Sequence, residues 1–170
     1  MNSNKNLVFL GMMGSGKSSI GNLVSKKLNL PFIDIDSLVI KNTGMSIPEI
    51  FKEKGEVYFR NLEEKITLKS LKKIKSVISL GGGGFINNKI RKEILANHFS
   101  FWLNWDESIL IKRIRNSKKR PLVFESTDQK IRTIIKNRVK IYTHSQFKIN
   151  CNKLTKTEIV KKIIKIYELN

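Results

Sequence analysis

A glycine-rich segment near the N-terminus carries the clearest chemistry in the sequence. Residues 11–18 read Gly-Met-Met-Gly-Ser-Gly-Lys-Ser and fit the P-loop pattern G-x-x-x-x-G-K-[ST]. In this pattern the glycines let backbone N–H groups turn toward phosphate oxygens, and the following helix N-terminus adds a positive partial charge. An apolar run precedes the segment and an amphipathic stretch follows it, as the motif requires. We therefore predict a binding site for the phosphates of ATP.

Individual residues of this segment have separate expected roles. The Lys17 ammonium should reach the β- and γ-phosphates, and the Ser18 hydroxyl should ligate one Mg²⁺. The remaining ATP contacts are expected from Gly14, Ser15, Gly16 and Ser19. The alternative is an ordinary glycine turn with a solvated lysine, and the flanking apolar and amphipathic patterns argue against it.

Two carboxylates, Asp34 and Asp36, end the second apolar run. Residues two apart on a strand point the same way, so both would face the cleft at the carboxyl edge of a parallel sheet, where ligands bind. One carboxylate can hold the hydration shell of Mg²⁺, and the other can hydrogen-bond a hydroxyl acceptor. The same spacing also suits a helix start with Asp36 as its N-cap, so the pattern alone leaves both interpretations open.

Two segments further along the chain suit an acceptor site. Residues 51–63 contain Arg60 and Glu63, which are three apart and therefore one helical turn from each other. A run of four glycines, 81–84, follows another apolar run. Glycines at such a position let the backbone approach a ligand closely.

The C-terminal half adds two more candidates. Arg120 is followed by proline and leucine in a polar loop, 116–126, of the kind that closes over an active site as a lid. Arg138 and Tyr142 are four apart on the next predicted helix and therefore share one face.

The elements that must position these residues follow from the hydrophobic pattern. Strand-length apolar runs alternate with longer segments of helical period, which predicts a three-layer α/β P-loop fold with a five-stranded parallel sheet. The predicted strands are 7–10, 31–35, 76–80, 99–103 and 147–151, and the predicted helices are 17–28, 37–73 with breaks at Gly44 and Gly55, 106–115, 128–142 and 156–169. At 170 residues without repeats or linkers, we expect one domain, 1–170, with 37–73 as a substrate-binding helical insertion.

Composition and charge limit the kinds of partner that the protein can bind. Lysine and arginine number 33 against 14 acidic residues, a formal charge of +19, which favours anionic ligands. The lysines are scattered and the aromatic residues occupy core-like positions, so we expect no nucleic-acid partner. The single cysteine cannot form an intramolecular disulfide, and no segment resembles a leader or a membrane span. We expect a cytoplasmic protein with no membrane partner that acts as a monomer.

Taken together, the motifs resemble the shikimate kinase family over nearly the whole chain. The family pattern joins a P-loop to D-x-D, F-x-x-x-G-E-x-x-F-R-x-x-E, L-G-G-G, R-P-L and R-x-x-x-Y in that order, and all occur here at compatible spacings. The last motif lacks the proline that the family often has, and His144 and Ser145 follow it. The resemblance implies a phosphotransferase that uses ATP and Mg²⁺ to convert shikimate to shikimate 3-phosphate, a step toward chorismate and the aromatic amino acids.

The resemblance also implies the acceptor site. Its expected members are Asp36, Arg60, Glu63, Gly81, Gly82, Gly83 and Arg138. In this arrangement Glu63 orients Arg60, and Asp36 holds the acceptor hydroxyls and can accept the proton of the attacking one. The chemistry agrees, because a carboxylated acceptor calls for planar guanidinium groups that bind bidentately, which Arg60 and Arg138 would supply.

On the nucleotide side the resemblance implies three more roles. Asp34 resembles the carboxylate that holds the hydrated Mg²⁺, Arg120 resembles the lid arginine that closes over the phosphates, and Arg113 resembles a residue near the adenine. The expected catalytic set is then Lys17, Asp36 and Arg120.

Two rival interpretations compete with this one. Another small-molecule kinase of similar build, such as a gluconate or nucleoside monophosphate kinase, would share the P-loop but need a different acceptor site. The set of Arg60, Gly82 and Arg138 fits a cyclic hydroxy acid better. A basic nucleic-acid-binding module with a relic P-loop would instead have aromatic residues interleaved with a basic stripe.

The lid arginine can be tested by substitution. An arginine that arrives only on closure acts on the transition state more than on bound ATP, so Arg120→Ala should lower the turnover number roughly 10³-fold and ATP affinity far less. Arg120→Lys should rescue little, because a point charge cannot reproduce the planar fork. Single-turnover kinetics beside equilibrium ATP titration measure both effects. Phosphoryl transfer within about threefold of the parent would make Arg120 a surface charge.

Overall fold

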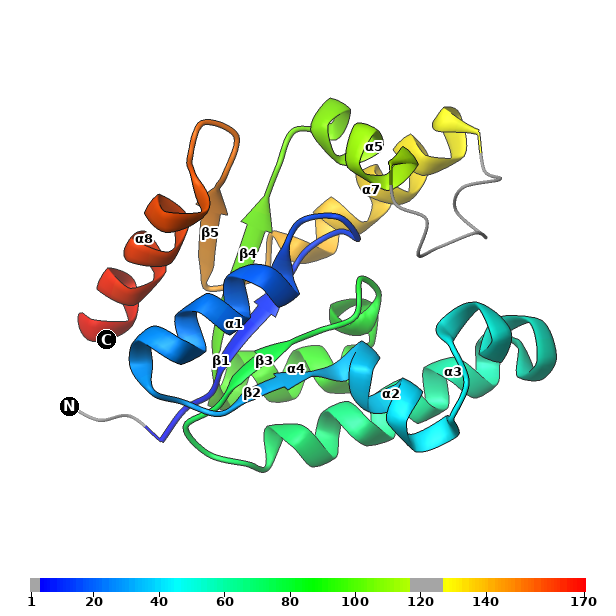
Figure 1. Ribbon diagram of the computed structural model, residues 1–170, viewed down its shortest axis with the longest axis horizontal. Helices are drawn as coiled ribbons and strands as arrows, with labels where there is room; N and C mark the ends of the chain where they lie inside the picture. The colour runs from blue at the N-terminus through cyan, green and yellow to red at the C-terminus, as the bar shows by residue number, and fades with distance from the viewer. Residues whose placement is uncertain (1–3, 117–126) are drawn as a thin grey trace.

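The computed structural model describes residues 4–116 and 127–170, so Arg120 and the predicted lid beyond Asn116 lie outside the described residues. A five-stranded sheet runs through the middle of the molecule in the order β2-β3-β1-β4-β5, and each pairing is parallel (Figure 1). The strands are β1 (Leu7–Leu10), β2 (Phe32–Asp34), β3 (Val77–Ser79), β4 (Phe99–Asn104) and β5 (Phe147–Asn150). The predicted α/β fold with a five-stranded parallel sheet is confirmed.

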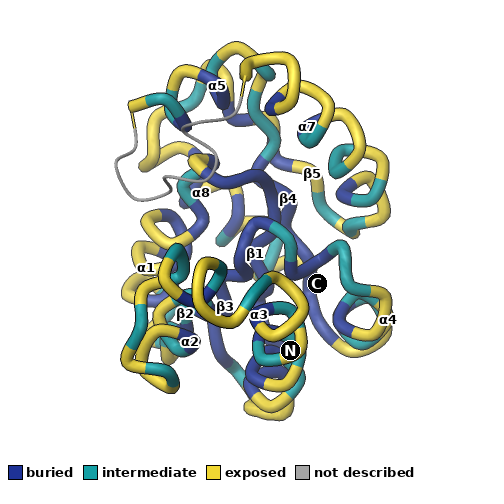
Figure 2. Tube along the Cα trace, turned by 90° about the vertical axis from the view of Figure 1, so that its right-hand side faces the viewer, coloured by how far each residue is buried: buried dark blue, intermediate teal, exposed yellow. Residues whose placement is uncertain are grey.

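Helices cover both faces of this sheet. They are α1 (Lys17–Leu28), α2 (Ile35–Thr43), α3 (Ile47–Leu71), α4 (Asn88–Asn97), α5 (Glu107–Arg115), α7 (Asp128–Tyr142) and α8 (Lys156–Glu168), with a 3₁₀ helix, η1 (Gly84–Ile86). Helices α1 and α8 pack on one face, and α3, α4 and α7 lie on the other. Figure 2 shows the strands buried inside and the outer sides of the helices exposed.

The central strand shows why the sheet needs both layers. All four residues of β1 are buried. Leu7 and Phe9 pack with the helices α1 and α8, whereas Val8 and Leu10 pack with the opposite layer. A parallel strand covered on both faces reads as a continuous apolar run, which is how β1 appears in the sequence.

The sheet order brings the candidate residues to one edge. β1 is the central strand and lies between β3 and β4. The chain first adds β2 and β3 on one side of β1, and then adds β4 and β5 on the other side. The P-loop follows β1, the two aspartates lie at and just after the end of β2, and the glycine tract follows β3. The carboxyl ends of parallel strands meet at the same edge, and the crevice beside such a switch point is where ligands of open α/β sheets bind.

The aspartate pair is arranged differently from the prediction. β2 ends at Asp34 and α2 begins at Ile35. The two aspartates therefore do not lie on one strand, as the prediction required. Asp34 is the N-cap of α2, and its Oδ1 accepts a hydrogen bond from the Ser37 N–H at 2.9 Å. The alternative with Asp36 as N-cap is also wrong, because Asp36 lies in the first turn of α2. The chain turns from strand to helix two residues earlier than either interpretation assumed.

The predicted breaks in the 37–73 segment are confirmed. Gly44 ends α2 with a φ of +68°. Ser46 then starts α3 with a capping box, in which its Oγ accepts from the Glu49 N–H and its own N–H donates to the Glu49 carboxylate. Inside α3, Gly55 has a φ of +81° and kinks the helix. The kink lets the two parts of α3 meet the same cavity from different directions.

Helix α4 was not predicted. Its buried residues are Ile90 and Ile94. Its N-cap is Asn87, whose Oδ1 accepts from the N–H groups of residues 89 and 90. Ile90 and Ile94 are four apart, the spacing of one helix face, so the sequence did contain a signal for this helix.

Within residues 4–116 and 127–170, no helix combines the length and the apolar character that a bilayer crossing needs.

A buried asparagine ties the amino edge of the sheet together. Asn6 precedes β1 and is 0% exposed. Its Nδ2 donates to the carbonyls of Leu71 at 3.0 Å and Lys73 at 2.6 Å, and its Oδ1 accepts from the Ser76 N–H at 2.9 Å. Its backbone carbonyl accepts from the Phe99 N–H at 2.9 Å. One residue therefore joins the end of α3 and the starts of β3 and β4 to β1.

Replacing this asparagine should destabilise the fold. Asn6→Ala leaves the buried Ser76 N–H and the Leu71 and Lys73 carbonyls without their partner, so the free energy of unfolding should fall by about 3 kcal/mol. Asn6→Asp should cost at least as much, because it points a carboxylate at two carbonyl oxygens. Urea unfolding measures both. In the control Asn42→Ala, on the exposed side of α2, stability should change by less than about 0.5 kcal/mol. A loss below about 1 kcal/mol for Asn6→Ala would contradict this account.

Candidate active site

The P-loop conformation depends on its glycines. Gly11, Gly14 and Gly16 have φ values of +139°, +76° and +86°. Residues with a Cβ rarely adopt such positive φ values. Helix α1 begins immediately after these glycines at Lys17. The loop therefore leads directly into the helix N-terminus, whose partial positive charge favours an anion.

Lys17 bends back onto this loop. Its Nζ donates to the carbonyls of Gly11 at 3.0 Å and Met12 at 2.9 Å, and the residue is only 7% exposed. A buried ammonium needs acceptors, and here the loop supplies them. Phosphate oxygens are stronger acceptors for the same cation, so bound ATP can replace these carbonyls.

Ser18 and Asp34 form a set of oxygen donors beside the loop. The Ser18 Oγ donates to Asp34 Oδ2 at 2.5 Å, and the Ser79 hydroxyl lies 3.4 Å from the Ser18 Oγ. Mg²⁺ takes one or two protein oxygens and fills its other positions with water and phosphate oxygens. A hydroxyl and a carboxylate next to the phosphate-binding loop fit that requirement.

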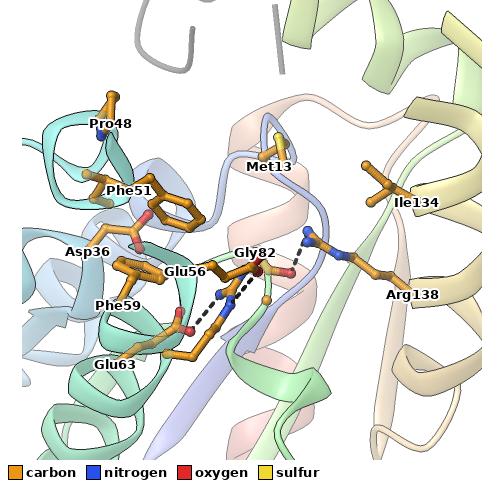
Figure 3. Close-up of a pocket in the computed structure, with 13 residues that line it drawn as sticks. Met13, Asp36, Pro48, Phe51, Glu56, Phe59, Glu63, Gly82, Ile134 and Arg138 are labelled. Atoms are coloured by element: carbon orange, nitrogen blue, oxygen red, sulfur yellow. Dashed lines mark hydrogen bonds and ion pairs between the residues drawn. The ribbon is translucent and has the colours of Figure 1, made fainter. Parts of the chain in front are cut away.

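A cavity of about 190 Å³ opens next to the P-loop. Figure 3 shows Phe51, Phe59 and Asp36 on one side, Ile134 and Arg138 on the other, and Gly82 between them. Its apolar walls come mainly from α3 and α7, and its charged members are Asp36, Glu56, Arg60, Glu63 and Arg138. A cavity with apolar walls and a few convergent charges suits a small polar molecule that carries its own charge.

Arg60 is held from two sides. Its Nη1 donates to Glu63 Oε2 at 2.8 Å and its Nε to Glu56 Oε1 at 3.3 Å, while its guanidinium lies over the Phe59 ring at 5.0 Å. Burial acts to lower the pKa of Arg60, but the two carboxylates outweigh it and raise the pKa above its ordinary value. The guanidinium therefore keeps its charge inside the cavity.

Glu63 is the buried member of this pair, with 3% exposure. Burial raises the pKa of its carboxyl, and the opposing effect of Arg60 is smaller. Gly81 separates Glu63 from Asp36, because a Cβ at Gly81 would collide with Glu63 Oε1 and lie 2.7 Å from Asp36 Oδ1. Only glycine leaves room for both carboxylates at this point.

Arg138 and Tyr142 hold the glycine tract from the opposite side. Arg138 Nη1 donates to the Gly82 carbonyl at 3.1 Å, and the Tyr142 hydroxyl donates to the same oxygen at 2.5 Å. Burial raises the pKa of Tyr142 to about 12, so the hydroxyl stays a donor at ordinary pH. A Cβ at Gly83 would lie 2.5 Å from Arg60 Nη1, which places the tract between the two arginines.

The structure therefore brings most of the predicted site residues together. Those that line the cavity are Asp36, Arg60, Glu63, Gly82, Gly83 and Arg138, and Gly81 lies against two of them. Ser18 and Asp34 meet at the P-loop, and Arg113 donates to the Gly14 carbonyl at 3.3 Å. Ser19 lies exposed at the start of α1.

Two site residues were missed from the sequence. Glu56 contacts Arg60 and lines the cavity, and its spacing of four from Arg60 on a helix was a usable signal. Trp105 donates its indole N–H to the Ser15 carbonyl. No short-range pattern predicts that contact, because the two residues are 90 apart in the chain.

Comparison with known proteins decides between the rival interpretations. The family model described as shikimate kinase matches residues 13–168. The chain belongs to the shikimate kinase family. As a shikimate kinase, it is an ATP-dependent kinase that acts on an alcohol, shikimate.

Individual relatives agree over nearly the full chain. A shikimate kinase from Thermodesulfovibrio yellowstonii is 37% identical over 165 residues, which cover 96% of this chain and 95% of the relative. The structure of shikimate kinase from Acinetobacter baumannii in complex with shikimate has a TM-score of 0.91 at 27% identity, covering 98% and 94% of the two chains. A gluconokinase from Sinorhizobium meliloti has a TM-score of 0.57 at 15% identity, covering 99% and 95% of the chains, which shows a shared fold alone.

Two carboxylates already engage Arg60 before a substrate binds. Its Nε and Nη1 already bond to Glu56 and Glu63, and a bidentate contact with a substrate carboxylate needs two neighbouring N–H groups. The fork that includes Nε is therefore available only when the Glu56 ion pair opens, whereas Nη1 and Nη2 keep further N–H groups for a substrate carboxylate. The Glu56 side chain is 65% exposed and the Glu63 side chain 3%, so water can take up the Glu56 carboxylate at much lower cost.

Removing the Glu56 charge should consequently strengthen binding of the acceptor. Glu56→Gln takes away a carboxylate that competes for Arg60, so the KM for shikimate should fall about two- to fivefold, as expected for a partly exposed ion pair. The turnover number and the KM for ATP should stay within about twofold. Steady-state kinetics measure all three.

Glu53→Gln on the preceding turn of α3 is the matched control and should change none of these constants. A higher KM for shikimate in Glu56→Gln would instead mean that Glu56 holds Arg60 in its working position.

Proposed function

We propose that the protein transfers the γ-phosphoryl group of ATP to the 3-hydroxyl of shikimate, giving shikimate 3-phosphate on the route to chorismate and the aromatic amino acids. The observation that carries this proposal is the cavity beside the P-loop, which Asp36 of α2 and Arg60 of α3 line together with Arg138 of α7. Figure 3 shows Asp36 and Arg138 on opposite sides of Gly82. A cyclic hydroxy acid needs cations for its carboxylate and an acceptor for its hydroxyls, and the cavity offers both. The shikimate complex of the Acinetobacter baumannii relative supports the same acceptor.

On the nucleotide side, the P-loop and Lys17 bind the phosphates. Lys17 exchanges the Gly11 and Met12 carbonyls for β- and γ-phosphate oxygens. The Ser18 hydroxyl and Asp34 carboxylate hold one Mg²⁺, which when bound neutralises charge on the phosphates. Because Asp34 also caps α2, its carboxylate is fixed in direction before any ligand arrives.

On the acceptor side, the cations orient the substrate. Arg60 and Arg138 bind the shikimate carboxylate, and Glu63 positions Arg60 through the 2.8 Å ion pair. Asp36 accepts hydrogen bonds from the hydroxyls and can take the proton of the attacking one. The rings of Phe51 and Phe59 cover this side of the cavity and limit access of water.

Catalysis is then a matter of position and electrostatics. The cavity contains Met13 of the P-loop as a lining residue, so the acceptor lies directly beside the phosphate site. Holding both reactants in line removes most of the entropic barrier, and the fixed cations stabilise the charge of the transferred group. Arg120 is proposed as a further cation on the strength of its sequence motif.

The remaining proposals concern the setting of the enzyme. We also propose that the enzyme acts as a monomer. We assign the protein to the cytoplasm, with neither nucleic acid nor membrane as a partner. The formal charge of +19 then serves mainly to attract anionic substrates.

A coupled ADP-release assay tests the function. Shikimate, quinate, gluconate and nucleoside monophosphates are offered as acceptors, and only shikimate should give fast release, because the two arginines and Asp36 match its carboxylate and hydroxyls. A chelator should abolish turnover, since phosphoryl transfer depends on the metal-bound phosphates. Equal or faster release with gluconate or a nucleotide would overturn the acceptor assignment, and full activity in chelator would overturn the Mg²⁺ assignment.

A further inference from the structure

A tryptophan outside the acceptor cavity contacts the back of the P-loop. Trp105 lies in the turn between β4 and α5 and is half-buried. Its Nε1–H donates to the Ser15 carbonyl at 2.9 Å. No role in the proposed mechanism uses this contact, although it reaches the loop that binds the phosphates.

Arg113 of α5 completes the arrangement. Its guanidinium stacks on the Trp105 ring, with the central carbon 3.7 Å from the ring centroid. Its Nη1 donates to the Gly14 carbonyl at 3.3 Å. α5 packs closely on the loop, because a Cβ at Gly14 would lie 3.4 Å from the Cβ of Arg113. Two stacked side chains thus bond to two successive carbonyls of the P-loop.

These bonds set the direction of the loop N–H groups. In a trans peptide the C=O and the following N–H point in opposite directions. Holding the Ser15 carbonyl outward, toward Trp105, therefore turns the Gly16 N–H to the other side of the loop. The glycines on both sides of Ser15 make this peptide easy to rotate, so a contact from outside the loop is needed to hold it.

We propose that Trp105 is a positioning residue for ATP, which holds the Ser15–Gly16 peptide with its N–H toward the phosphates and supports Arg113 at the neighbouring Gly14 carbonyl. The inference rests on the proposed use of ATP at this loop. It differs from a packing role, which would affect stability and both substrates alike. Loss of the indole N–H instead allows the Ser15–Gly16 peptide to rotate. This rotation weakens the contacts with the phosphates and leaves the acceptor site unchanged.

Two substitutions separate the donor from the ring. Trp105→Phe keeps a ring for Arg113 and removes the N–H, and Trp105→Leu removes both. Calorimetry with Mg-ATP and with Mg-tripolyphosphate, in the absence of shikimate, should show dissociation constants about five- to tenfold higher for Trp105→Phe and higher still for Trp105→Leu. Both phosphate ligands should be affected equally, and shikimate binding should stay within about twofold. Lys112→Ala removes an exposed charge next to Arg113 and is the matched control.

Several outcomes would overturn the proposal. One is binding of both phosphate ligands within about twofold of the parent in Trp105→Phe. A second is a loss of shikimate affinity as large as the loss of phosphate-ligand affinity. A third is weaker binding of ATP with unchanged binding of tripolyphosphate, which would place Trp105 at the adenine base. The proposal would also be overturned if the unsubstituted protein bound ATP but not tripolyphosphate. Because no turnover is measured, a failure to phosphorylate shikimate would count against the proposed function without affecting this result.

Fluorescence gives a second measurement that does not depend on a Trp105 variant. The chain has two tryptophans, so Trp102→Phe leaves Trp105 as the single reporter. Tripolyphosphate should change its emission, because the ligand binds the peptide that the indole holds. No change at saturating tripolyphosphate would contradict the proposal.

Discussion

The ion pair between Arg60 and Glu63 is the interaction on which the acceptor site depends. A carboxylate with 3% exposure is costly without a partner, and Arg60 Nη1 at 2.8 Å supplies one. The pair in turn dictates its surroundings. Gly81 must lack a side chain to admit Glu63 beside Asp36, and Gly83 must lack one to admit Arg60. The glycine tract is therefore a consequence of placing three charged groups around one strand end.

The cations of the site are each held by an internal acceptor that a ligand can replace. Lys17 bonds to two loop carbonyls, Arg60 to the exposed Glu56 and Arg138 to the Gly82 carbonyl. Such contacts keep buried cations satisfied in the absence of substrate. They also mean that ligand binding exchanges hydrogen bonds instead of adding them, so the net gain for each contact is well below its gross strength.

Local patterns were sufficient to predict the sheet and the P-loop, whereas the roles of the acceptor-site residues were predicted from the resemblance to the shikimate kinase family. The strand runs and the glycine motif report on neighbours in sequence, and the structure follows them closely. The aspartate pair was harder, because whether Asp34 ends a strand or starts a helix depends on where the chain turns. Helix α4 was missed although Ile90 and Ile94 have helical spacing. The Trp105 contact joins residues 90 apart, which no local pattern contains.

The groups that bind ligands in the active site are oriented by hydrogen bonds from other parts of the chain. Asp34 caps α2 and pairs with Ser18, and Tyr142 fixes the Gly82 carbonyl, so these groups are oriented by short hydrogen bonds before substrate arrives. Orientation of this kind costs nothing at the moment of reaction. The Gly14 and Ser15 carbonyls of the P-loop accept from donors on α5 and on the β4–α5 turn, which are 99 and 90 residues away in the chain. The conformation of the phosphate-binding loop therefore depends on side chains from a distant part of the sequence, as the orientation of the Gly82 carbonyl depends on Tyr142.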